Sequence, residues 1–99
     1  MTAATTQSPA TLSPATQPRV ASGFRLQWEL AQNSHVLLYP EGMVKLNTSA
    51  AEIMLRCNGT RSIAAIAAEL EQAFAAKDLE AEVIAFVEMA GKQQWLAWD

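Results

Sequence analysis

The stretch Phe24-Arg25-Leu26-Gln27-Trp28-Glu29-Leu30 alternates apolar and polar side chains without interruption. Residues two apart share one face of an extended strand, so this stretch predicts a strand with one buried face. The turn residues 31–34 separate it from His35-Val36-Leu37-Leu38-Tyr39, which predicts a second strand. Pro40-Glu41-Gly42 is typical of a tight hairpin, after which Met43-Val44-Lys45-Leu46 returns as a short third strand. The three segments therefore predict an antiparallel β-meander.

The hydrophobic period changes from strand to helix after Asn47. Ser49 and Glu52 have the spacing of a capping box, and Asn58-Gly59 is a good stop signal, which together bound a first helix. Ser62 can cap a second helix and Asp78 a third. The apolar residues in helical register are Ile63, Ile66, Leu70 and Phe74 in the second helix, and Leu79, Val83, Phe86, Val87 and Ala90 in the third. Three strands followed by three helices predict a segregated α+β fold rather than an alternating α/β one.

The chain divides into two parts by composition. Residues 1–18 carry no charge, are rich in Thr, Ala and Pro, and have few large apolar side chains. Such a segment buries too little surface to offset its chain entropy, so we expect a disordered tail there. We expect the folded domain to span residues 19–99, with Trp95-Leu96 folding back onto the core.

Composition limits the classes of function. The 99 residues carry ten acidic and seven basic side chains, a formal charge of -3, which argues against a nucleic-acid partner. No apolar run reaches the roughly 20 residues of a membrane span, and the N-terminus lacks the pattern of a secretory signal. A single cysteine excludes an internal disulfide and a zinc site built from cysteine pairs. We therefore expect a small cytoplasmic domain.

The residues capable of chemistry do not form a recognisable catalytic motif. Cys57 falls on the apolar stripe of the first predicted helix and is interpreted as a buried hydrophobe, since a reactive thiol needs an electropositive setting. His35, at the start of a strand, is interpreted as a half-exposed hairpin residue. The four glycines are scattered and form no phosphate-binding loop. We expect no catalytic residue, no metal and no cofactor.

Without a catalytic motif, the candidate functional feature is a binding surface formed by the third predicted strand and the third predicted helix. The third predicted strand lies at an edge of a small sheet, and an open edge recruits another chain unless something guards it. The third predicted helix has an apolar face broadened by Ile84, Val87 and Gly91. One interpretation is that a small domain buries both flanks of its helix. The other is a groove between strand and helix that accepts an extended peptide by edge pairing.

Several blocks together resemble the PqqD family. They are Phe24-Arg25-Leu26-Gln27-Trp28-Glu29, the run from His35 through Tyr39-Pro40-Glu41-Gly42 to Asn47, the block Cys57-Asn58-Gly59-Thr60-Arg61-Ser62-Ile63, and Trp95-Leu96. The resemblance covers nearly everything after the tail, and its most specific parts are the run from Leu37 to Asn47 and the Asn58-Gly59-Thr60-Arg61-Ser62 block.

The resemblance implies a non-catalytic peptide chaperone of pyrroloquinoline quinone (PQQ) biosynthesis. Such proteins bind the precursor peptide PqqA and present it to the radical-SAM enzyme PqqE, which cross-links a glutamate and a tyrosine of the peptide. The family fold is winged-helix-like, and the peptide adds a strand beside the third strand, against the third helix. Carried onto this sequence, the strand edge is Met43, Val44, Lys45 and Leu46, and the helical wall is Ile84, Val87, Glu88 and Gly91.

Two other classes of function are alternatives. A winged-helix DNA-binding module would carry several basic residues on its recognition helix, whereas the second predicted helix has none after Arg61. A structural dimerisation domain would pair its open edge with a second copy. We expect a monomer, with a strand-swapped homodimer as the alternative.

Overall fold

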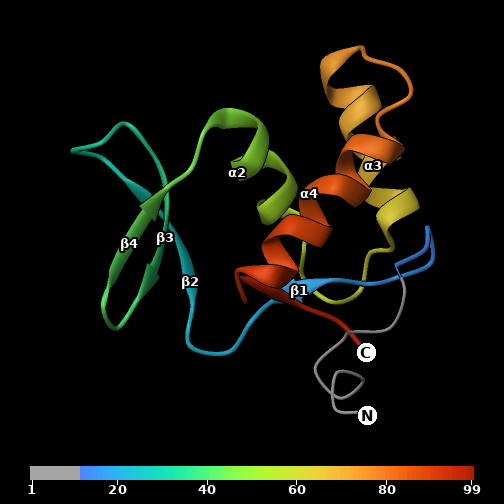
Figure 1. The fold of residues 1–99 in the computed structure, drawn as a ribbon. Helices are drawn as coiled ribbons and strands as arrows, with labels where there is room; N and C mark the ends of the chain where they lie inside the picture. The colour runs from blue at the N-terminus through green and yellow to red at the C-terminus, as the bar shows by residue number, and fades with distance from the viewer. Residues whose placement is uncertain (1–11) are drawn as a thin grey trace, which may run out of the picture.

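The computed structural model describes residues 12–99 and contains the predicted meander. Strands β2 (Arg25–Glu29), β3 (Ser34–Tyr39) and β4 (Gly42–Lys45) form an antiparallel sheet in the order β2-β3-β4. Leu26, Leu37 and Val44 are partners across the three strands and belong to the face that packs on the helices. Figure 1 shows this sheet on one side of the molecule and the helices on the other. The predicted α+β class is confirmed.

Three helices follow the sheet, as the sequence predicts. They are α2 (Thr48–Leu55), α3 (Ile63–Phe74) and α4 (Glu80–Lys92). Their buried stripes meet in one core with Leu37 of β3; the fully buried helix residues include Met54, Ile63, Ile66, Val83 and Val87. No helix in residues 12–99 is long and apolar enough to cross a membrane.

The helix caps agree with the sequence at one position and differ at two. Ser62 caps α3 as predicted, accepting the Ala65 N–H at 3.1 Å. The predicted capping box at Ser49 is wrong, because Asn47 precedes α2 and accepts the Ala50 N–H at 2.8 Å. Asp78 does not cap α4. It adopts a left-handed backbone with φ 55°, and the following residue, Leu79, is the N-cap and has no side-chain cap bond.

A second, two-stranded sheet, which no pattern in the sequence predicted, closes the domain. Strand β1 (Arg19–Val20) pairs with β5 (Leu96–Ala97), with Val20 opposite Leu96. Figure 1 shows the two strands side by side near the chain end. Leu96 is buried, which agrees with the expectation that this segment folds back onto the core.

The segment 12–18 differs from the expected disordered tail. The Thr16 carbonyl accepts the Ile63 N–H at 2.9 Å, and the Pro14 carbonyl accepts the Ala64 N–H at 3.0 Å. These amides begin α3 and have no partner within the helix, so the segment supplies acceptors for them. Leu12 packs against the core. The ordered unit therefore begins before the predicted boundary at residue 19, and the rest of the predicted tail, residues 1–11, lies outside the described residues.

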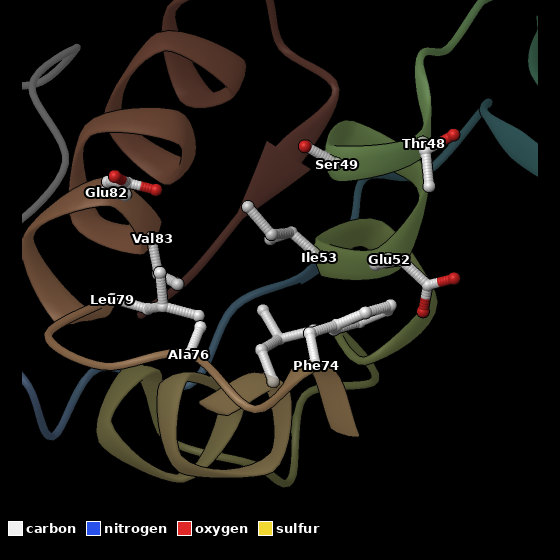
Figure 2. Close-up of a pocket in the computed structure, with 10 residues that line it drawn as sticks. Thr48, Ser49, Glu52, Ile53, Phe74, Ala76, Leu79, Glu82 and Val83 are labelled. Atoms are coloured by element: carbon white, nitrogen blue, oxygen red, sulfur yellow. The ribbon is translucent and has the colours of Figure 1, made fainter. Parts of the chain in front are cut away.

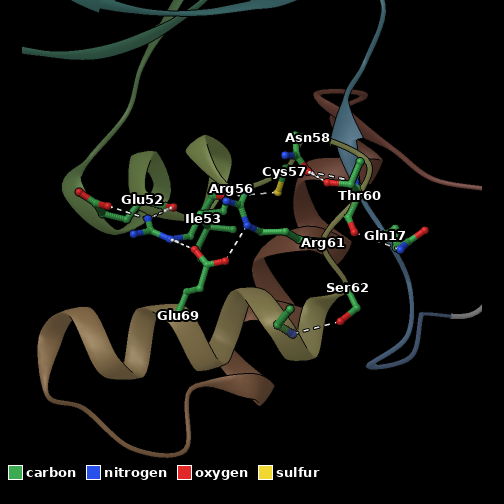
Figure 3. Close-up of polar contacts among 11 residues, drawn as sticks. Gln17, Glu52, Ile53, Arg56, Cys57, Asn58, Thr60, Arg61, Ser62 and Glu69 are labelled. Atoms are coloured by element: carbon green, nitrogen blue, oxygen red, sulfur yellow. Dashed lines mark hydrogen bonds and ion pairs between the residues drawn. The ribbon is translucent and has the colours of Figure 1, made fainter.

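Polar contacts fix the turn between α2 and α3 (Figure 3). Arg56 bonds Glu52 at 2.8 Å and Glu69 at 3.1 Å, and Arg61 bonds the second oxygen of Glu69 at 2.6 Å. Glu69 thus joins two arginines that flank the turn. The side-chain oxygen of Asn58 accepts two hydrogen bonds from Thr60, one from its N–H at 3.0 Å and one from its hydroxyl at 2.8 Å. The block Cys57–Ile63, which contributes to the family resemblance, therefore stabilises the turn between the two helices.

Candidate functional site

The edge strand β4 has one side without a strand partner among residues 12–99. The Leu46 N–H donates to the His35 carbonyl at 3.0 Å, which fixes which residues bond across the β3–β4 ladder. Bonded pairs alternate along an antiparallel ladder, so Val44 directs its backbone groups toward β3. Met43 and Lys45 therefore direct their N–H and C=O groups to the open side.

The side chains of β4 alternate between the two faces of the sheet. Val44 lies on the helix-facing side with Leu37, so Lys45, the partner of Val36, points its side chain to the opposite face. Met43 shares that opposite face and is 45% exposed. The edge thus offers a guest chain its backbone through Met43 and Lys45 and an apolar side chain through Val44.

A groove of about 360 Å³ lies beside this edge, and we call it the edge groove. Strand β4, helix α2 and helix α4, which border it, are labelled in Figure 1. Its apolar lining comes from β4 and the residue after it, both helices and the segment before β5: Val44, Leu46, Ala50, Ile53, Phe86, Met89 and Trp95. Lys45, Asn47, Ser49 and Glu82 complete the lining. An extended chain placed here would meet backbone groups on one side and apolar side chains on the other.

The structure brings together only part of the predicted site. Three of the four predicted strand residues, Val44, Lys45 and Leu46, line the edge groove, and Met43 lies beside them on the same strand. The predicted helical residues lie elsewhere on α4. Val87 is fully buried in the core, and Ile84 packs against it from one flank. Glu88 is exposed, and neither it nor Gly91 is among the groove residues.

Gly91 allows another side chain to approach α4 closely, and that side chain is Trp98, near the C-terminus of the same chain. A Cβ atom at Gly91 would lie 2.3 Å from the Trp98 ring, so the indole occupies the space that the missing side chain leaves. Gly91, which belongs to the expected helical wall, is therefore covered by the indole of Trp98.

The helical wall of the edge groove is the other flank of α4. Glu82, Phe86 and Met89 line the groove. They are four and three residues apart and so share one stripe of the helix. Met89 is 39% exposed, which is high for a large apolar side chain on a helix that packs against the core. That stripe was visible in the sequence, but nothing there distinguished it from the flank with Ile84 and Gly91.

Cys57 and His35, the two residues considered for chemistry, both pack against other parts of the domain. Cys57 is buried, its thiol donates to the Ile53 carbonyl at 3.2 Å, and burial raises the pKa of the thiol to about 12. It is thus a protonated thiol at neutral pH, as its interpretation as a buried hydrophobe expects. His35 stacks edge-on against Trp28 with ring centroids 5.1 Å apart. Within residues 12–99, no three His, Cys, Asp or Glu side chains are grouped to hold a metal ion.

The sequence of this chain is similar to those of known proteins over most of its length. A family model described as "Coenzyme PQQ synthesis protein D (PqqD)" matches residues 34–96. A relative from Azotobacter vinelandii named "PqqA binding protein" is 55% identical over 80 residues, covering 80% of this chain and 87% of its own. A Klebsiella pneumoniae protein of the same name is 51% identical over 75 residues, covering 75% of this chain and 82% of its own.

A solved structure has the same fold. The solution NMR structure of the PqqD truncation of Methylobacterium extorquens PqqCD superposes with a TM-score of 0.73 at 27% identity, covering 89% of this chain and 96% of that one. That protein is described as a functional, stand-alone recognition element for ribosomally synthesised and post-translationally modified peptides. Sequence and fold lead to the same conclusion: this chain belongs to the PqqD family.

Proposed function

We propose that this chain binds the precursor peptide PqqA as an added strand along β4 and takes no part in bond chemistry itself. The relatives named "PqqA binding protein" support the identity of the ligand. The observation that carries the proposal is the open side of β4, where the backbone groups of Met43 and Lys45 border an apolar groove. Strand addition uses such groups for affinity and neighbouring pockets for specificity.

The energetics require the groove as well as the edge. Met43 and Lys45 each offer one donor and one acceptor, so a guest strand can form four backbone hydrogen bonds with them. At about 0.5–1.5 kcal/mol net for each, these bonds contribute about 2–6 kcal/mol. Ordering a flexible peptide costs about 2–5 kcal/mol, which offsets most of that gain. Apolar side chains entering the edge groove must therefore supply much of the affinity.

We further propose that the bound peptide is delivered to PqqE. A protein that holds the peptide and docks on the enzyme raises the local concentration of substrate without altering the chemical step. PqqE should then cross-link PqqA faster when this chain is present, provided that the peptide concentration is low. Mass spectrometry of the peptide over time measures this rate. An identical rate with and without the chain would contradict delivery while leaving peptide binding untouched.

The binding proposal is tested by removing one outward donor. Lys45→Pro deletes the N–H on the open side without deleting a bond to β3, and proline is tolerated on edge strands. We expect titration of fluorescein-labelled PqqA, followed by anisotropy, to give a Kd about 5- to 10-fold higher than for the wild type. The matched control is Lys45→Ala, which removes the side chain and keeps the N–H. We expect its Kd within about threefold of the wild type.

Equal affinities for a folded Lys45→Pro variant and the wild type would contradict edge pairing. If the variant does not fold, PqqA peptides N-methylated at single positions apply the same test from the other side. Methylation at alternate positions should then weaken binding, because only alternate residues of a strand bond to the edge.

A further inference from the structure

A second cavity lies where the three helices meet, and we call it the helix-junction pocket. It has a volume of about 260 Å³. Ile53 of α2, Leu70 and Phe74 of α3, and Leu79 and Val83 at the start of α4 supply its apolar lining. Figure 2 shows these helices surrounding the pocket, with Phe74 at its base.

The helix-junction pocket continues the edge groove. Ser49, Ile53 and Glu82 line both cavities. They come from α2 and α4, which face each other across the pocket (Figure 2), so the two cavities share this part of their lining. A chain that follows β4 toward the beginning of α2 therefore approaches the residues that the pocket shares with the edge groove.

The lining favours one large apolar side chain. An apolar cavity of about 150 Å³ already holds a benzene ring, so this pocket has room for a leucine, phenylalanine or tryptophan side chain. Phe74 is 53% exposed although it lines the pocket, which leaves aromatic surface for a guest to cover. Covering such a ring is favourable both through its area and through ring contacts.

A negative charge lies between the two cavities. The Glu52 carboxylate is already paired with Arg56 at 2.8 Å. Glu82 lines both cavities, is exposed, and has no ion pair with any other residue in the range 12–99. A basic residue of the guest chain would therefore find a partner there.

We propose that the helix-junction pocket is a second anchoring site for the same bound peptide. One large apolar side chain of PqqA, outside the segment paired with β4, enters it, and a neighbouring basic residue faces Glu82. The inference rests on the proposed function, because it names how the peptide is held beyond the strand edge. It makes the recognised segment longer than the edge strand and defines its chemistry: a strand-forming stretch followed or preceded by a basic residue and a bulky apolar one.

The first test removes the aromatic lining. Phe74→Ala should raise the Kd for fluorescein-labelled PqqA about 5- to 30-fold. The matched control is Leu55→Ala, because Leu55 is also a half-exposed apolar residue, at 46%, but lines neither cavity. We expect its Kd to match the wild type.

The second test identifies the guest side chain. An alanine scan of PqqA against the wild type and Phe74→Ala forms a set of double-mutant cycles. One large apolar peptide position should lose most of its effect in the Phe74→Ala background. Glu82→Gln should weaken binding about two- to threefold and reduce the salt dependence of Kd, whereas Glu88→Gln, on another face of the same helix, should not.

The outcomes separate this inference from the proposed function. Absence of PqqA binding by the wild type would overturn both. Weak binding by Lys45→Pro together with wild-type affinity for Phe74→Ala, and no peptide position coupled to Phe74, would overturn the second anchoring site alone. Methyl NMR of Leu79, which lines only the helix-junction pocket, adds a test that needs no variant. Its methyl signals should shift when PqqA is added, and unchanged signals would contradict the inference.

Discussion

The contact between Gly91 and Trp98 makes a quantitative prediction about α4. A Cβ atom at Gly91 would lie 2.3 Å from Cη2 and 2.8 Å from Cζ3 of the indole, well inside van der Waals contact. The substitution Gly91→Ala therefore forces the ring to move. Because the ring is part of the C-terminal segment that follows β5, its displacement loosens the packing of that segment on α4.

Two effects of opposite sign determine the magnitude. Alanine is favoured over glycine inside a helix by about 1 kcal/mol. Overpacking costs about 1–3 kcal/mol. Gly91→Ala should therefore lower the free energy of unfolding by about 0–2 kcal/mol in the wild type. In a Trp98→Ala background the clash is gone, so the same substitution should raise it by about 1 kcal/mol. The two backgrounds should thus differ by about 1–3 kcal/mol.

Urea unfolding of the four proteins, followed by far-UV circular dichroism, measures this difference as a double-mutant cycle. The change of sign between backgrounds is the decisive result, since helix propensity alone gives the same gain in both. Additivity within about 0.5 kcal/mol would refute the reasoning, because Gly91 and Trp98 would then be energetically independent.

Three further predictions concern stability. Glu69→Gln should lower the free energy of unfolding by about 1 kcal/mol, because it weakens two partly exposed arginine pairs, and urea unfolding at low and high salt should show a smaller loss at high salt. The folded-state pKa of Cys57, about 12, lies above its ordinary value of 9.0, so the unfolded chain loses its proton first and stability should fall as pH rises above about 9. Cys57→Ala should show a smaller loss over that pH range; an identical slope would contradict the burial argument. Deleting residues 1–18 should destabilise the domain relative to deleting residues 1–11, because the first deletion also removes the carbonyls that accept the first amides of α3; equal melting temperatures would contradict this role.

The elements with a strong local pattern were predictable from the sequence. Strict alternation over residues 24–30 and the Pro40-Glu41-Gly42 turn indicated the sheet and its order, and Ser62 marked the start of α3. Each of these signals is contained within a few residues. The same holds for the edge position of β4, which follows from a meander with three strands.

The missing parts depend on contacts between distant segments. Strands β1 and β5 are two residues long, too short for an alternating pattern to appear. Asn47 and Ser49 are both good N-caps, and only the turn after β4 decides between them. The core stripe of α4 is flanked by apolar residues on both sides. Phe86 and Met89 line the edge groove, whereas Trp98 lies against Gly91 on the other flank, and no local signal in the sequence distinguishes the two flanks.

Hydrogen exchange of the β4 amides tests the central claim most directly. In the free protein the Val44 amide is directed toward β3, whereas the Met43 and Lys45 amides are directed to the open side. Saturating PqqA should slow exchange at Met43 and Lys45 by at least about tenfold relative to the free protein, with a smaller change at Val44. Unchanged exchange at Met43 and Lys45 in a sample saturated with the peptide would show that PqqA binds without pairing to this edge.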